Sequence, residues 1–375
     1  IDALATAGAR FENARSTVPL TLPSHVTMMT GLLPVAHGVR DNGVVFAPQP
    51  SSPTLARRLR DAGYRTGAFV GAYVLDRRFG LADGFDFYDD RIRRNPDEGA
   101  RLEAERRGGD VVDGAVAWLN QSTSPFFLWV HLYDPHAPYE PPAGYAEKAN
   151  GDAYNGEVAY ADAQVARIVE VLRARGASPS TVVAVAGDHG EGLGEHGEQT
   201  HGMLAYDSTL RVPLVLSGAS IQPRVVSMPV SLVDLAPTLL RLAKGASASP
   251  GASDLLSTTA TERDVYAETQ YPRIAGWHPL SVLAGERWKL VRSSEVELYD
   301  LSGDPSELHN VASANAGVVQ GMTKQLGELQ SVTPAAPPAV AAEASERLRA
   351  RGYVSGSSAP AGGVDPRAPN PARVI

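Results

Sequence analysis

Residues 181–201 read TVVAVAGDHGEGLGEHGEQTH, and this stretch decides the fold. Its apolar, β-branched beginning breaks off at Gly187-Asp188-His189-Gly190, a pattern typical of a buried strand that ends in a loop. A carboxylate and an imidazole therefore stand next to each other at the end of a predicted strand, and His201 follows in the same loop. We expect metal-binding and proton-carrying side chains to gather at this place.

The strand pattern recurs along the chain. Short apolar runs bounded by turn residues also occur at 66–71, 125–132 and 212–218. Apolar residues at helical spacing lie between these runs, at 52–62, 109–119 and 156–175. This alternation predicts an α/β fold in which helices cover a mostly parallel sheet. Ligands gather at the C-terminal ends of strands in such sheets, and this is where Asp134 and His136 also fall.

The character of the sequence changes after about residue 245. Four short segments then resemble antiparallel strands of a small second sheet, at 264–269, 279–285, 287–292 and 296–300, and a helical pattern follows at 314–331. We therefore predict three parts: a catalytic α/β domain over 1–245, a small sheet and helix over 246–331, and a tail over 332–375. The tail is rich in proline and alanine and is expected to be largely disordered.

Composition excludes several classes of function. The chain has 375 residues and a net charge of −8, which argues against general binding to nucleic acid. Because it has no cysteine, disulfides, thiolate zinc sites and a cysteine nucleophile are excluded. No apolar run reaches the roughly 18 residues that predict a membrane span. The opening IDALATAGARF resembles the middle of a helix, so we expect the chain to be a fragment of a longer protein.

The segment Thr21-Leu-Pro23-Ser-His predicts the start of a helix, because proline suits a first helical turn. Two roles are open for the Thr21 hydroxyl. It could cap the helix, as threonine commonly does. Alternatively, it could lie beside the free N–H groups and the positive end of the helix dipole, where a sulfate or phosphate oxygen is well held.

Three further patterns suggest chemistry, and each has a simpler interpretation. His131, Asp134 and His136 occupy a passage from strand to loop, which could equally be an ordinary polar loop with a buried His131. Asp188 and His189 suit Zn, Mn or Fe, and aspartate oxygen alone suits Ca or Mg, but the same residues could lie on a solvated glycine-rich turn. Asn42 could donate its amide to an oxyanion or simply form a turn at Asp-Asn-Gly.

Taken together, these segments resemble the sulfatase-like branch of the alkaline phosphatase superfamily. Four motifs carry the resemblance, in order: TLPSHVTMMTGLLPVAHGVRDN at 21–42, WVHLYDPHAPYEPP at 129–142, GDHGEGLGEHGEQTHG at 187–202 and ELYDLSGDPSELHNVA at 297–312. The first is similar to the nucleophile signature Cys- or Ser-x-Pro-Ser-Arg, the second to a His-x-Pro substrate segment, and the third to a metal-binding Asp-His turn. The fourth resembles the usual C-terminal ending of sulfatases.

The resemblance implies an α/β/α sandwich and in-line attack on a sulfur or phosphorus ester. It places Thr21 at the nucleophile position and makes Asp188 and His189 metal ligands. It further implies that His136 contacts the ester or its leaving group and that Asn42 binds an oxyanion. His201 stands where relatives carry a lysine or histidine that binds substrate or a second metal.

Three departures from the family pattern modify this expectation. Sulfatases convert cysteine or serine into formylglycine, and Thr21 cannot form that aldehyde, whereas related phosphodiesterases use threonine directly. His25 replaces the arginine of the signature. Relatives also carry one or two metal-binding aspartates on a strand that would precede residue 1.

We therefore predict a metal-dependent hydrolase of phosphate or phosphonate esters, with sulfate esters next in order. Thr21 is the predicted nucleophile and a ligand of an activating Ca, Mn or Zn ion, with one or two of His131, His136 and His201 carrying protons. A second ion held by Asp134, His136 and His201 is left open. So are three other functions: a classical sulfatase, a transferase of phosphoryl-linked groups to lipid or glycan, and a non-catalytic binding domain. The expected partner is a small-molecule, glycan or lipid ester.

Overall fold

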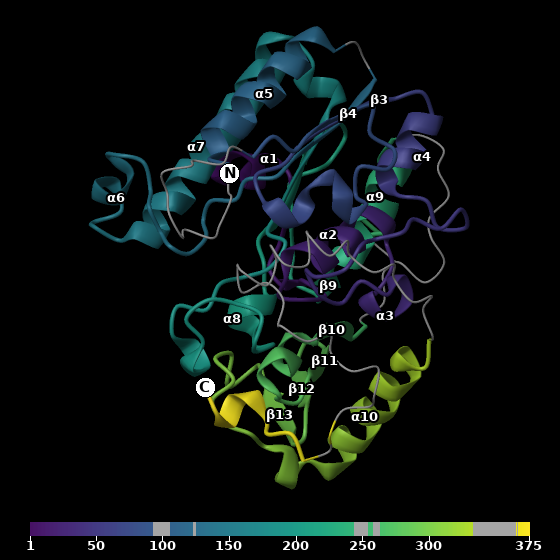
Figure 1. Cartoon of the computed structure of the whole chain (residues 1–375), viewed down its shortest axis with the longest axis vertical. Helices are drawn as coiled ribbons and strands as arrows, with labels where there is room; N and C mark the ends of the chain where they lie inside the picture. Colours follow the sequence, from purple (N-terminus) through teal and green to yellow (C-terminus); the bar gives the residue numbers. More distant parts are fainter. Residues whose placement is uncertain (93–105, 123–124, 244–253, 258–262, 333–364, 366) are drawn as a thin grey trace. The chain divides into compact units, whose positions relative to one another are not determined.

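The computed structural model describes residues 1–92, 106–122, 125–243, 254–257, 263–332, 365 and 367–375 (Figure 1). The chain forms two compact units. Unit 1 comprises Ile1–Ala9, Pro48–Val185 and Val215–Arg224. Unit 2 comprises Arg10–Ala47, Ala186–Leu214 and Val225–Ile375.

Unit 1 contains a parallel sheet with the strand order β4-β3-β5. Its strands are β3 (Arg65–Phe69), β4 (Phe87–Asp89) and β5 (Phe126–Val130). The helices of this unit are α1 (Asp2–Ala7), α4 (Leu55–Asp61), α5 (Gly108–Gln121), α6 (Tyr145–Lys148) and α7 (Ala153–Ala174). The helices α5 and α7 lie side by side (Figure 1), and their apolar sides form one core with Phe69 of β3. At Gly67 a Cβ would lie 2.7 Å from the ring of Trp118, so only glycine lets α5 pack this closely on β3.

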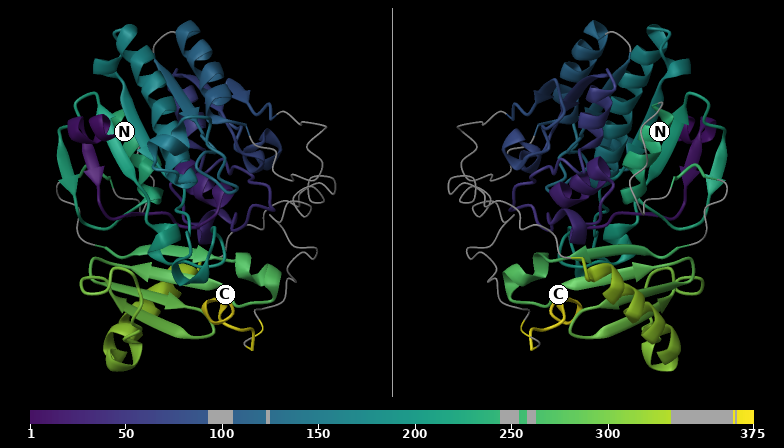
Figure 2. Two further views of the ribbon diagram at one scale, coloured as in Figure 1. Left: turned by 90° about the vertical axis from the view of Figure 1, so that its left-hand side faces the viewer. Right: turned by 90° about the vertical axis from the view of Figure 1, so that its right-hand side faces the viewer.

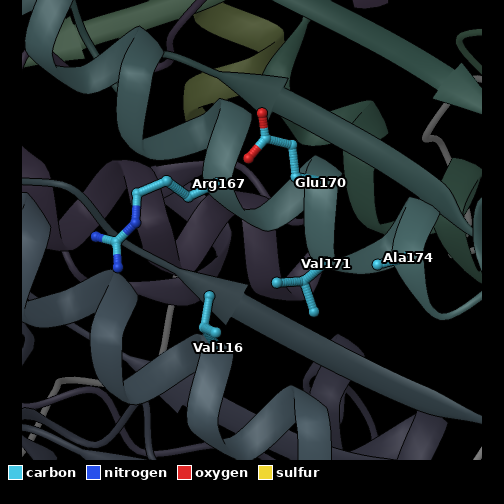
Figure 3. A pocket seen from close by; sticks show the side chains of 5 residues that line it. All are labelled: Val116, Arg167, Glu170, Val171 and Ala174. Carbon is cyan, nitrogen blue, oxygen red and sulfur yellow. The ribbon is translucent and has the colours of Figure 1, made fainter.

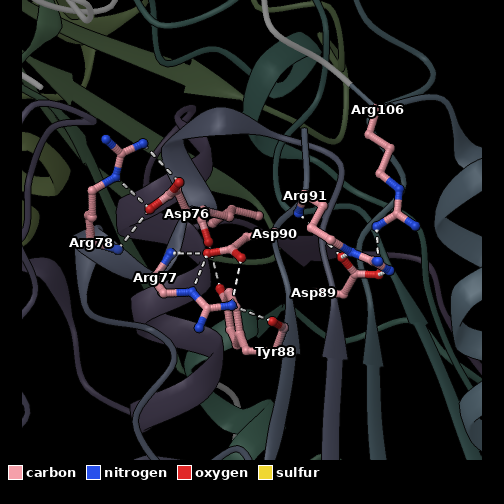
Figure 4. A network of polar contacts seen from close by, with 9 residues as sticks. Asp76, Arg77, Arg78, Tyr88, Asp89, Asp90, Arg91 and Arg106 are labelled. Atoms are coloured by element: carbon pink, nitrogen blue, oxygen red, sulfur yellow. Dashed lines mark hydrogen bonds and ion pairs between the residues drawn. The ribbon is translucent and has the colours of Figure 1, made fainter. Parts of the chain in front are cut away.

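Ion pairs gather at the C-terminal end of β4 (Figure 4). The buried carboxylate of Asp89 pairs with Arg91 at 2.7 Å and with Arg106 at 3.2 Å, and Asp90 pairs with Arg77 at 2.8 Å. These arginines hold the pKa values of both carboxyl groups below the usual range, despite the opposing effect of burial. This edge of the sheet is therefore held together by charge as well as by packing.

A four-stranded sheet has the order β6-β7-β1-β8. Its strands are β1 (Ala9–Phe11), β6 (Val182–Ala186), β7 (Leu214–Gly218) and β8 (Arg224–Val226). A short parallel pair joins β2 (Ala14–Arg15) to β9 (Val230–Ser231). The α/β class and the mostly parallel pairing predicted from the sequence are confirmed.

Unit 2 contains an antiparallel sheet of β10 (Val265–Thr269), β11 (Leu280–Ala284), β12 (Trp288–Arg292) and β13 (Val296–Asp300), in that order. The helix α10 (Ala316–Gln330) lies against one face of this sheet (Figure 2). Its residues Met322 and Leu326 join a core with Leu290. Alternate residues such as Val291 face a second core on the other side. The small antiparallel sheet predicted near the C-terminus is confirmed, and α10 follows the predicted helix closely.

The other helices of unit 2 are α2 (Thr21–Thr30), α3 (Pro34–His37), α8 (Asp207–Leu210) and α9 (Leu235–Leu242). A buried charge cluster joins several parts of this unit. Lys289 of β12 is fully buried and pairs with Asp207 at 2.8 Å and with Glu307 at 2.6 Å, while Arg15 pairs with Asp207 at 2.7 Å. Two cations and two carboxylates thus balance each other inside unit 2.

Most of the predicted disordered tail falls outside the described residues. Residues 367–375 are described, and they differ from the prediction. Pro371–Arg373 form a short 3-10 turn, and the buried Asn370 donates a 2.9 Å hydrogen bond from Nδ2 to Glu297. The hydrogen bond from Asn370 to Glu297 explains why this segment is ordered, which its composition did not predict. The predicted domain limits at 245 and 331 stay predictions.

No helix in the described part of the chain has the length and apolarity to cross a membrane.

Candidate active site

The helix α2 begins at Thr21 and is buried along its whole length. Leu20 occupies the cap position in an extended conformation, with φ −147° and ψ 142°, and no side chain caps the helix. The capping role considered for Thr21 is therefore wrong, because Thr21 is already the first helical residue. Its hydroxyl lies 3.4 Å from Nε2 of His189.

The Asp188-His189 pair follows β6, as predicted. Nδ1 of His189 lies 2.8 Å from the carbonyl oxygen of Gly190, which can only accept, so Nδ1 donates this hydrogen bond and Nε2 is left for other partners. That Nε2 lies 3.4 Å from the Thr21 hydroxyl and 3.6 Å from a carboxylate oxygen of Asp188. The predicted nucleophile Thr21 and the predicted metal ligand Asp188 therefore both lie close to Nε2 of His189, the second predicted ligand.

His25 is a member of this group that the sequence interpretation missed. Its Nδ1 donates a 2.8 Å hydrogen bond to the carbonyl oxygen of Thr21 and lies 3.5 Å from Asp188. Burial lowers the pKa of His25, although the nearby carboxylate of Asp188 opposes this effect. A signal was present in the sequence, because His25 is four residues after Thr21 and so lies on the same side of α2.

His201 also reaches this place. Its ring lies 4.2 Å from that of His189, centroid to centroid, and its Nδ1 donates a 2.9 Å hydrogen bond to Glu191. Burial, reinforced by His189, lowers the pKa of His201 well below its usual value. Glu191 is a second residue that sequence reasoning missed, since it appeared as one more acidic residue in a glycine-rich loop.

Asn42 lies beside the start of α2. Its Oδ1 accepts a 2.9 Å hydrogen bond from the backbone N–H of Leu22, next to Thr21. The side chain is only 1% exposed, and its Nδ2 has no hydrogen-bond partner among the described residues. A buried N–H group without a partner typically costs about 1–3 kcal/mol, so a bound oxyanion would complete it.

His131 and Asp134 belong to unit 1. The backbone N–H of His131 donates to the carbonyl of Phe69 at 2.9 Å, and its Nδ1 lies 3.4 Å from the backbone N–H of Gly71. Asp134 accepts a 2.9 Å hydrogen bond from the N–H of Gly108 at the start of α5. Burial raises the pKa of Asp134. One of its oxygens is thus engaged at a helix terminus.

His136 is also in unit 1, and its orientation is closely defined. Its Nδ1 donates a 2.6 Å hydrogen bond to the carbonyl of Ala137, and its ring stacks on Tyr133 with 4.2 Å between centroids. The buried carboxylate of Glu157 accepts from the backbone N–H groups of His136, at 3.0 Å, and of Glu140, at 2.8 Å. The second metal site predicted for Asp134, His136 and His201 stays a prediction.

The residues around His189 fit a divalent ion. An unprotonated imidazole nitrogen and a carboxylate are the donor types that Zn and Mn accept, and the carboxylate also suits Ca.

A separate open hollow lies on the surface of α5 and α7 and is lined by Val116, Arg167, Glu170, Val171 and Ala174 (Figure 3). It contains none of the predicted site residues.

Comparisons with known proteins agree with this architecture. The family model for sulfatases matches residues 1–246, and the model for the C-terminal part of N-sulphoglucosamine sulphohydrolase matches residues 194–332. The chain is 27% identical over 411 aligned residues to the choline-sulfatase of Rhizobium meliloti (strain 1021), covering 86% of this chain and 79% of that protein.

Two solved structures show the same fold. The phosphonate monoester hydrolase of Agrobacterium radiobacter matches with a TM-score of 0.71 and 21% identity, over 88% of this chain and 90% of that one. The structure of BT4656 with its substrate D-glucosamine-2-N,6-O-disulfate matches with a TM-score of 0.73 and 18% identity, over 88% and 92%. The sulfatase model covers well over half of the sequence. The chain therefore belongs to the sulfatase family of ester hydrolases, within the alkaline phosphatase superfamily.

Proposed function

We propose that this chain hydrolyses phosphate, phosphonate or sulfate esters by in-line attack of the Thr21 hydroxyl. The observation that carries the proposal is the position of Nε2 of His189, 3.4 Å from the Thr21 hydroxyl and 3.6 Å from the carboxylate of Asp188. A hydroxyl, an imidazole lone pair and a carboxylate thus share one small volume. This combination suits activation of an alcohol as a nucleophile.

The chemistry of threonine sets this chain apart from sulfatases that use formylglycine. Threonine carries a methyl group on Cβ, so oxidation there would give a ketone and not an aldehyde. We therefore propose that the hydroxyl itself attacks. The new bond joins Oγ1 to phosphorus or sulfur while the bond to the leaving oxygen breaks. Water then cleaves the ester of Thr21 and restores the hydroxyl.

A divalent ion of Ca, Mn or Zn, held by Asp188 and His189, would lower the pKa of the Thr21 hydroxyl and offset negative charge. The chain itself supplies the other functions. The hydrogen bond to Leu22 fixes the amide plane of Asn42, which leaves Nδ2 to donate to a non-bridging oxygen.

Proton transfer completes the proposal. His201 lies beside His189 and can accept or donate at Nε2, because Glu191 engages its Nδ1. The motif resemblance adds His131 and His136 as proton carriers for the leaving group. A second ion bound by Asp134, His136 and His201 would have to share Asp134 with the backbone N–H of Gly108, from which it already accepts a hydrogen bond.

Substrate chemistry gives a second candidate function. Phosphorus esters are favoured by the threonine at position 21 and by the similarity to a phosphonate monoester hydrolase. Sulfate esters are favoured by the sulfatase family model and by the similarity to a choline-sulfatase. Small or sugar-linked esters are the substrates we propose, and transfer to a lipid or glycan acceptor stays a prediction from the sequence.

The test compares an aryl sulfate, a phosphate monoester, a phosphodiester and a phosphonate monoester, each with Ca, Mn and Zn in turn. Thr21→Ala should abolish turnover, while Thr21→Ser should keep part of it, because serine retains a hydroxyl. Thr30→Ala is the matched control, since Thr30 is buried in the same helix and its hydroxyl contacts only local backbone, the carbonyl of Val26 and the N–H of Leu32.

Mass spectrometry of the quenched reaction gives a direct readout. A peptide carrying Thr21 should gain the group that the substrate transfers during turnover: sulfo, phosphoryl, esterified phosphoryl or phosphonyl. Thr21→Ala with the same rate as Thr30→Ala would refute the nucleophile. Turnover of the aryl sulfate alone would reverse the preference for phosphorus.

A further inference from the structure

The loop that carries Asn42 is fastened to the antiparallel sheet of unit 2. Arg40 donates from Nε and Nη2 to the two carboxylate oxygens of Glu268 on β10, which makes a bidentate ion pair. Glu268 is fully buried, while the Arg40 side chain keeps about a third of its surface exposed. Bidentate pairs of this kind fix direction as well as distance.

Glu268 is itself held firmly. The hydroxyl of Tyr266, two residues earlier on β10, donates to the same carboxylate. Gln330 at the end of α10 donates to Ser281 of β11 at 2.7 Å and to the Tyr266 hydroxyl at 3.5 Å. The backbone N–H of Glu268 also donates to the carbonyl of Thr17 at 2.9 Å. The carboxylate therefore has little freedom to move.

The other end of the loop meets the start of α2. Asn42 accepts from the backbone N–H of Leu22 at 2.9 Å, and the backbone N–H of Asn42 donates to Asp41 at 2.7 Å. One residue, Asp41, separates Arg40 from Asn42. Its side chain accepts the hydrogen bond from the backbone N–H of Asn42. Arg40 and Asn42 therefore lie on one short stretch of backbone that is held at both ends.

We propose that Glu268 is a positioning residue: through Arg40, it holds Asn42 so that Nδ2 donates to the developing oxyanion. This inference rests on the proposed role of Asn42. It assigns to the small C-terminal sheet a part in transition-state stabilisation, because the carboxylate of β10 is the fixed point of the loop.

The experiment compares Glu268→Gln, Asn42→Ala and the double variant, with Glu297→Gln as the matched control. Glu297 is also a buried glutamate of this sheet, and it accepts hydroxyl hydrogen bonds from Tyr206 and Tyr299. Turnover of the fastest substrate and inhibition by vanadate are measured, since vanadate imitates the five-coordinate transition state.

Asn42→Ala should reduce turnover about a hundredfold, the usual cost of one oxyanion donor. Glu268→Gln should reduce turnover and vanadate affinity about tenfold, in the range found for groups that orient others, with KM nearly unchanged. The double variant should be no worse than Asn42→Ala. Glu297→Gln should keep its vanadate affinity.

The possible failures are distinguishable. Full activity of Asn42→Ala would remove the oxyanion role from the proposed function. If Asn42→Ala is impaired but Glu268→Gln behaves like Glu297→Gln, or adds its full effect to Asn42→Ala, only the positioning role is overturned. Should Glu268→Gln not fold, Tyr266→Phe decides the matter against Tyr299→Phe. A smaller effect of the same kind supports positioning, and equality of the two overturns it.

Discussion

The hydroxyl of Ser24 donates a 2.6 Å hydrogen bond to the backbone carbonyl of Asp188. Ser24 is buried one turn into α2, and Asp188 stands at the end of β6, 164 residues further along the chain. The bond fixes the first turn of the helix against the loop that carries Asp188 and His189. The distance between the proposed nucleophile and the proposed metal ligands is therefore set by the backbone as well as by side chains.

Ser24→Ala should lower the apparent affinity for the activating ion about 10–100-fold, as is usual when a group that orients a ligand is lost. The measurement is a titration of metal-depleted protein followed by turnover. Ser16→Ala is the control, because the Ser16 hydroxyl contacts Ser24 and the carbonyl of Val18 but makes no bond to Asp188. Equal metal affinity in the two variants would contradict the prediction.

Glu157→Gln should displace His136, because the amide nitrogen of glutamine would face a backbone N–H that the carboxylate now accepts. If His136 protonates the leaving group, esters with poor leaving groups should slow about tenfold more than nitrophenyl esters. Rates on a series of phenyl esters measure this slope. Glu170→Gln, an exposed change on the same helix, should leave the slope unaltered.

Glu198 predicts a pH-dependent stability. Burial raises the pKa of its carboxyl group to about 8, although it accepts from the backbone N–H groups of Met203 and Leu204. Between pH 4.5 and 8 the unfolded chain loses a proton that the folded chain keeps, so this group lowers stability as pH rises, by at most about 1.4 kcal/mol per pH unit.

Glu198→Gln removes that titration. The difference in unfolding free energy between variant and parent should therefore shift in favour of the variant from pH 5 to pH 8. Urea unfolding at both pH values measures it. A difference that is the same at pH 5 and pH 8 would show that Glu198 is ionised in the folded protein.

Lys289→Met should destabilise the protein by about 3–5 kcal/mol, the usual cost of breaking a buried ion pair. Asp207 would keep Arg15 as its partner, whereas the buried Glu307 would lose its cation. Adding Glu307→Gln should recover much of the loss, because it removes the uncompensated charge. Denaturation of both variants tests this, and a double variant as unstable as Lys289→Met would disprove the charge argument.

The regular elements were predictable because they depend on local periodicity. Each strand expected at 66–71, 125–132, 181–187 and 212–218 has a counterpart in β3, β5, β6 and β7. The helices α4, α5, α7 and α10 also lie where apolar spacing predicted them. The sequence left open whether Thr21 caps its helix. In the structure the extended Leu20 occupies the cap position, so Thr21 is the first helical residue.

The polar partners of the site were not predictable in this way. The contacts of His25 and Glu191 are known only from the structure. His25 lies beside Asp188, and Glu191 accepts a hydrogen bond from His201. The order of residues 367–375 likewise depends on Glu297, a partner 73 residues from Asn370. Pairs as distant as His25 with Asp188 or Asn370 with Glu297 leave no pattern within a short window of sequence, whereas Glu191 and His201 are only 10 residues apart.

Arg40 and Glu268 are separated by 228 residues. A nascent chain that has emerged only as far as α9 contains α2 and the Thr21 segment, but its Arg40 has no carboxylate from β10 to bind. Competence for catalysis should therefore arise late in synthesis, when β10 arrives. Fragments cut before that strand should bind metal better than they turn over substrate.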